Sequence, residues 1–115
     1  MLMERHHLDA ALKTTGVPFR FSSTPGHWNI VPASNLKPWA KEEQAALEEA
    51  ARKIGGQITY KLTTYDGRYY DAFTATPGRG FRVDTGSGTD TLNVEAYRAL
   101  GLDPESPPPI RRVRG

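Results

Sequence analysis

The chain has 115 residues, enough for one domain with a substantial core and too few for two. Its formal net charge is only +2, which excludes a strong overall field that would draw the whole protein onto nucleic acid. It contains no cysteine, so a disulfide framework and a thiolate ligand or nucleophile are excluded. The N-terminus lacks the apolar core of a signal peptide, and no apolar run reaches the roughly 20 residues of a membrane span, so we expect a cytoplasmic protein with no membrane partner.

The first predicted element is a short amphipathic helix over residues 3–15, which Gly16 ends. Its apolar positions with helical spacing are Leu8, Ala11 and Leu12. His6 and His7 are adjacent on this helix, so we expect their rings to point apart. Because no cysteine or nearby carboxylate pair completes a tetrahedral site, we expect no metal and no cofactor.

Residues 19–31 are predicted to form a β-hairpin that turns over residues 24–27. This register sets Phe21 opposite Ile30. The residues that then share a face are Phe19, Phe21, Trp28 and Ile30. His27, at the tip of the hairpin, is the best-placed general acid or base in the chain. The sequence leaves open whether this hairpin joins the same sheet as the later strands.

The longest helix is predicted over residues 38–54, with Pro38 in its first turn and Gly55-Gly56 after its end. The apolar stripe of this helix consists of Trp39, Leu47, Ala50, Ala51 and Ile54. Alanines recur along the helix, which indicates close packing against a sheet rather than a deep cofactor cleft.

Two turns divide residues 57–83 into three predicted strands. The first turn is Asp66-Gly67, a preferred pair for a two-residue hairpin, and it sets Tyr65 opposite Arg68. Facing residues of an antiparallel pair share a side, so this turn decides which side chains of both strands point the same way.

The second turn lies at residues 76–80, where a five-residue loop sets Val83 opposite Phe73. We therefore expect the three strands to pair in chain order and to share one apolar face. That face is expected to carry Ile58, Tyr60, Leu62, Phe73, Ala75, Phe81 and Val83.

The opposite face of these strands is expected to be exposed and basic. Its members are Thr59, Lys61, Thr63, Tyr65, Arg68, Tyr70, Thr74 and Arg82. Tyrosines that stack on bases and cations that bind phosphates are typical of single-stranded nucleic-acid platforms. The same composition is also typical of a solvated sheet face or of a protein-docking face.

Asp71 breaks this pattern, because strand parity puts it on the apolar face. A carboxylate there needs a partner or water, and buried acids of this kind occur both in structural pairs and at active sites. Asp71 and His27 are therefore the two catalytic candidates. With Arg68 and Arg79 as phosphate ligands, they would supply a metal-independent ribonuclease if the two hairpins converge.

Asp84 is expected to be a turn residue that caps the loop after it. In that loop, residues 86–89 could hold a phosphate through backbone N–H groups, but the lysine of a P-loop is missing, so we interpret them as a linker. A short helix follows, with Asn93 as its N-cap and Gly101 after its end. Residues 104–115 are a proline-rich tail. Its basic residues are Arg111, Arg112 and Arg114.

These features predict a single small α+β domain over residues 1–103, in the order α-ββ-α-βββ-α, followed by an extended tail over residues 104–115. The expected core is a four- or five-stranded antiparallel sheet with helices on one face. We expect a non-enzymatic binding module that engages a nucleic acid or a protein through the exposed sheet face and the tail, as in small bacterial, phage or mobile-element proteins. The alternatives are a small metal-independent ribonuclease of the bacterial-toxin type and a structural subunit of an oligomer or larger assembly.

Overall fold

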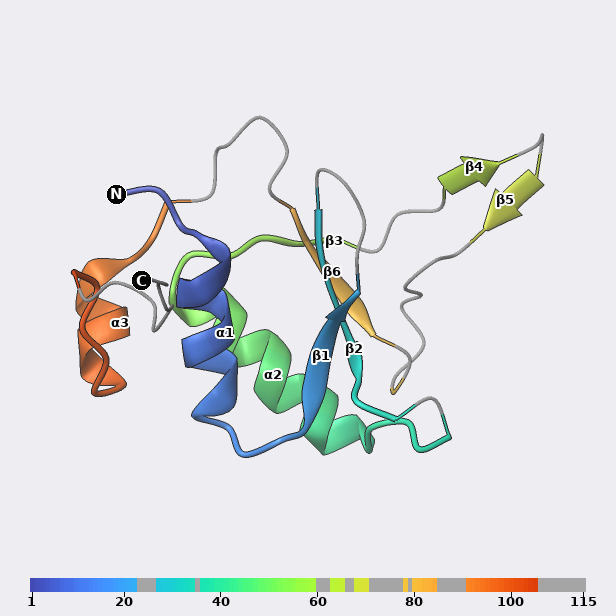
Figure 1. Cartoon of the computed structure of the whole chain (residues 1–115), viewed down its shortest axis with the longest axis horizontal. Helices are drawn as coiled ribbons and strands as arrows, with labels where there is room; N and C mark the ends of the chain where they lie inside the picture. The colour runs from blue at the N-terminus through green and yellow to red at the C-terminus, as the bar shows by residue number, and fades with distance from the viewer. Residues whose placement is uncertain are drawn as a thin grey trace, which may run out of the picture.

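A computed structural model gives the fold of the chain (Figure 1). The residues that it describes are 1–22, 27–34, 36–59, 63–65, 68–70, 78, 80–84 and 91–105. The elements in chain order are α1 (Arg5–Lys13), β1 (Phe19–Ser22), β2 (His27–Pro32), α2 (Lys41–Lys53), β3 (Ile58–Thr59), β4 (Thr63–Tyr65), β5 (Arg68–Tyr70), β6 (Phe81–Asp84) and α3 (Val94–Ala99). The predicted α+β class with antiparallel strands is confirmed. Within the described residues, no helix is long and apolar enough to cross a membrane.

The main sheet has four antiparallel strands in the order β1-β2-β6-β3. Phe21 lies opposite Ile30, which confirms the register predicted for the N-terminal hairpin. That hairpin joins the same sheet as the later strands, because β2 pairs directly with β6. The sequence left open whether the hairpin joins this sheet, because the answer depends on β2 and β6, which are about fifty residues apart in the chain.

Of the three later strands, the predicted pairing of the second with the third is wrong. Val83 on β6 lies opposite Trp28 on one side and opposite Ile58 on the other. A strand has only two edges, so no edge of β6 is left for the predicted partner Phe73, which itself lies outside the described residues. The β4–β5 hairpin forms a separate two-stranded sheet instead.

The predicted apolar face is confirmed for its three described members, and the other four, Tyr60, Leu62, Phe73 and Ala75, lie outside the described residues. Ile58, Phe81 and Val83 lie on one face of the sheet and pack in the main core. The helices supply the other half of this core, from the residues Leu8, Ala11 and Leu12 of α1 and Leu47, Ala50 and Ala51 of α2. Figure 1 shows α1 and α2 beside each other on the same side of the sheet.

The helix ends follow from local chemistry. Gly16 has a φ of +79°, a left-handed conformation that ends the run after α1. Helix α2 begins at Lys41, three residues later than predicted, because the backbone N–H of Trp39 donates to the carbonyl oxygen of Gly78 and keeps this stretch extended. As predicted, Asn93 caps α3, and its Oδ1 accepts a hydrogen bond from the backbone N–H of Ala96 at 3.1 Å.

Candidate functional site

The β4–β5 hairpin is the first place where predicted binding residues are brought together. Tyr65 pairs with Arg68, which confirms the register set by the Asp-Gly turn, and Thr63 pairs with Tyr70. Cross-strand partners and residues two apart share a side, so these four positions belong to one face of the hairpin. Tyr69 belongs to the other face, opposite Thr64. In Figure 1 the hairpin projects away from the four-stranded sheet.

The main sheet carries a row of four polar positions on the face opposite the apolar core. In order across the strands, they are Ser22, Asn29, Arg82 and Thr59. Nε of Arg82 donates a hydrogen bond to Oδ1 of Asn29 at 2.9 Å. Asn29 has no exposed surface, and within the described part of the chain its Nδ2 has no hydrogen-bond partner.

The prediction that Arg82 is exposed is wrong, because only 4% of its surface is accessible. It lies on β6, an inner strand of the sheet between β2 and β3. Strand parity correctly put Arg82 on the face opposite Phe81 and Val83, but that face is not open to solvent at this position. A guanidinium in this position is a structural hydrogen-bonding group and not an open phosphate ligand.

His27, one of the two catalytic candidates, pairs with Asp84 at the end of the same two strands. Asp84 is the last residue of β6, and the loop that it is predicted to cap lies outside the described residues. By register, this pair lies on the same sheet face as Asn29 and Arg82 and is the next pair along on that face. The other candidate, Asp71, lies outside the described residues. So do Lys61, Arg79 and the three tail arginines Arg111, Arg112 and Arg114.

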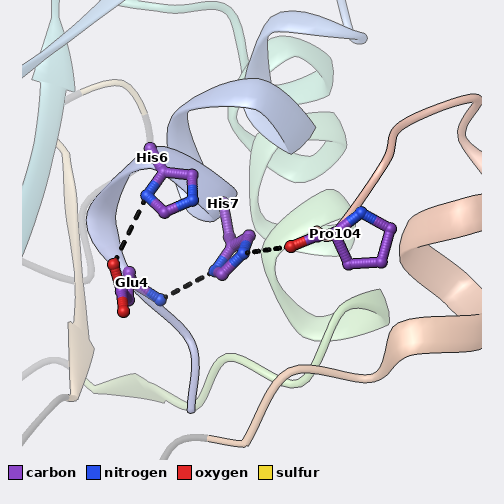
Figure 2. A network of polar contacts seen from close by, with 4 residues as sticks. All are labelled: Glu4, His6, His7 and Pro104. Atoms are coloured by element: carbon purple, nitrogen blue, oxygen red, sulfur yellow. Dashed lines mark hydrogen bonds and ion pairs between the residues drawn. The ribbon is translucent and has the colours of Figure 1, made fainter. Parts of the chain in front are cut away.

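The two histidines of α1 form a cluster that the sequence reasoning missed (Figure 2). Their ring centroids are 4.1 Å apart, so the expectation that the rings point apart is wrong. His7 is 3% exposed, whereas His6 lies at the surface with Nδ1 3.5 Å from a carboxylate oxygen of Glu4. A sequence signal was available, since His7 is four residues before the buried Ala11 and one before the buried Leu8, on the apolar side of the helix.

Both ring nitrogens of His7 contact backbone groups. Nδ1 accepts a hydrogen bond from the backbone N–H of Glu4 at 3.0 Å, and Nε2 lies 3.5 Å from the carbonyl oxygen of Pro104. This arrangement requires the neutral tautomer with its proton on Nε2. Burial lowers the pKa of His7 from its ordinary value, and the neighbouring His6 lowers it further, against the opposing effects of Pro104 and Glu4.

A surface hollow of about 420 Å³ adjoins this cluster and is lined by Glu4, Arg5, His6 and Asp9. These side chains do not form a metal site, because no group of three or more potential ligands occurs among the described residues. The hollow is therefore lined by charged side chains that do not make up a set of metal ligands. Comparisons with protein-family models, with curated proteins and with solved structures gave no match for the chain.

Proposed function

We propose that this protein is a non-enzymatic binding module whose ligand is single-stranded nucleic acid. The observation that carries the proposal is the register of the β4–β5 hairpin, which puts two tyrosines and an arginine on one face. These residues are Tyr65, Arg68 and Tyr70. Among the residues that the structure describes, β4 and β5 pair with each other and not with the four-stranded sheet.

The chemistry of this face suits unpaired bases. A tyrosine ring stacks on any base and contributes about 1–3 kcal/mol per base, without sequence preference. An arginine on the same face can pair with a phosphate and also stack on a base. An isolated two-stranded hairpin is marginally stable in water, so a ligand laid along one face would add order as well as affinity.

The buried Arg82 reduces the proposed interface from the whole sheet to the hairpin. The remaining cations of the interface are Lys61 and Arg68, with the tail residues Arg111, Arg112 and Arg114 as further phosphate contacts. A small number of phosphate contacts agrees with the net charge of +2 and predicts a modest affinity that depends on salt. Such a module fits a bacterial, phage or mobile-element protein that handles exposed single strands.

The test uses the full chain and a fluorescently labelled single-stranded oligonucleotide, with affinity measured by anisotropy at several salt concentrations. Tyr70→Ala is expected to weaken binding by about 1–3 kcal/mol, and Tyr69→Ala, on the other face of the same strand, is the matched control that should not. Arg68→Gln should reduce the salt slope by about 0.7, the value for one phosphate contact on a single strand.

Absent or salt-insensitive binding would remove nucleic acid as the ligand. The hairpin would then be assigned to a protein contact. If size-exclusion chromatography with light scattering showed a large complex that deletion of residues 104–115 dissolves, the chain would be a structural subunit of that assembly.

A second candidate is a metal-independent ribonuclease, and the observation that favours it is the pairing of His27 with Asp84 beside the Asn29–Arg82 pair. A histidine next to a carboxylate can take the proton of a ribose 2′-hydroxyl as that oxygen attacks the neighbouring phosphorus. The bond from phosphorus to the 5′-oxygen of the next nucleotide then breaks, which leaves a 2′,3′-cyclic phosphate, and the departing oxygen takes a proton from a second acid. Asp84 would orient the imidazole in this scheme, and Asp71 remains the candidate for the second acid or base.

This candidate predicts cleavage of a fluorogenic RNA in the presence of a chelator, and no cleavage of the matching DNA, which lacks the 2′-hydroxyl. His27→Ala should abolish cleavage and relieve any toxicity of expression. His6→Ala is the control, because His6 lies on α1 and not on the sheet. Intact RNA after prolonged incubation with the unaltered protein would exclude the ribonuclease.

A further inference from the structure

We draw no further inference here: the strongest candidate, the buried pair of Asn29 and Arg82 on the face of the four-stranded sheet opposite the apolar core, has an Asn29 amide nitrogen without a hydrogen-bond partner in the described part of the chain, but nothing in that part of the structure shows what covers it.

Discussion

Nε of Arg82 and Oδ1 of Asn29 are 2.9 Å apart, and the hydrogen bond between them joins β6 to β2 with both side chains buried. It lies on the sheet face opposite Phe81 and Ile30, the two apolar residues of the next cross-strand pair. A buried guanidinium contributes to stability only while its partners stay in place, because an unpaired charge in the interior is strongly unfavourable.

Because Asn29 and Arg82 share a hydrogen bond, we expect their substitutions to have non-additive effects on stability. Asn29→Leu should destabilise the fold by about 1.5–3 kcal/mol, because the charged donor of Arg82 then loses an acceptor. Arg82→Met should cost a similar amount, and the double variant should cost less than the sum of the two by about 0.5–3 kcal/mol. Urea unfolding followed by tryptophan fluorescence measures all three, and strictly additive losses would contradict the proposed contact.

The close approach of α2 to the segment before α3 makes a second prediction. Gly55 has a φ of +109°, and a Cβ at this position would collide with the carbonyl oxygen of Thr91. Gly16 also has a positive φ, but a Cβ there meets nothing within 4 Å. Gly16→Ala should therefore cost about 1–2 kcal/mol for its conformation alone, and Gly55→Ala distinctly more. Thermal unfolding of the two variants checks this, and equal losses would contradict the collision.

Trp39 anchors the connection that leads into α2. Its Nε1 donates to the carbonyl oxygen of Pro18 at 2.8 Å, and its ring packs on Phe81 with centroids 6.0 Å apart. Trp39→Phe should cost about 0.5–1.5 kcal/mol, since one partly buried hydrogen bond is lost, and Trp39→Ala about 3–5 kcal/mol. Trp28→Phe, at a partly buried position, is the milder control. A smaller loss for Trp39→Phe than for Trp28→Phe in urea unfolding would argue against the anchor.

The lowered pKa of His7 predicts a loss of stability in acid. Its unfolded value is near 6.5 and its folded value is lower, so below pH 6.5 the unfolded chain binds more protons than the folded one. The free energy of unfolding should therefore fall as the pH decreases from about 6.5 towards and through the folded pKa. His7→Gln should flatten this part of the stability curve measured by urea unfolding. An unchanged slope would mean that another group causes it.

The raised pKa of Tyr97 predicts a loss of stability at alkaline pH. Burial raises its pKa above the ordinary value of 10.0, and the carboxylates of Asp103 and Asp9 raise it further. Above pH 10 the unfolded chain loses this proton first, so stability should fall as the pH rises towards the folded pKa. Tyr97→Phe should remove that part of the alkaline slope, and Tyr70→Phe serves as the control on the hairpin. Spectrophotometric titration of the phenols provides an independent check of the order in which they ionise.

Several local features could be predicted because they depend on neighbours in the chain. The Asp-Gly turn was enough to pair Tyr65 with Arg68. The side-chain oxygen of Asn93 was enough to begin α3. Turn geometry and capping act over a few residues, so the sequence contains all the participants.

The candidate sites were harder to predict because they combine distant segments. The row that includes Asn29 and Arg82 exists only because β2 lies beside β6, and the sequence reasoning had given that edge to another strand. His7 becomes a buried contact only when Tyr97 and Pro104 cover it from the other end of the chain. In both cases a local pattern showed which way the residue points but not what covers it.

The amino-acid sequence by itself determined roughly where the helices lie, which turn pairs Tyr65 with Arg68 and which face Phe81 and Val83 share, since these follow from backbone sterics and short-range hydrogen bonds. Only the tertiary structure decided that β3 and β2 flank β6, that Arg82 is enclosed and that His7 binds the segment after α3. Segments far apart in the chain compete to pair with each strand edge and to cover each apolar surface. The outcome depends on how the whole chain packs at once.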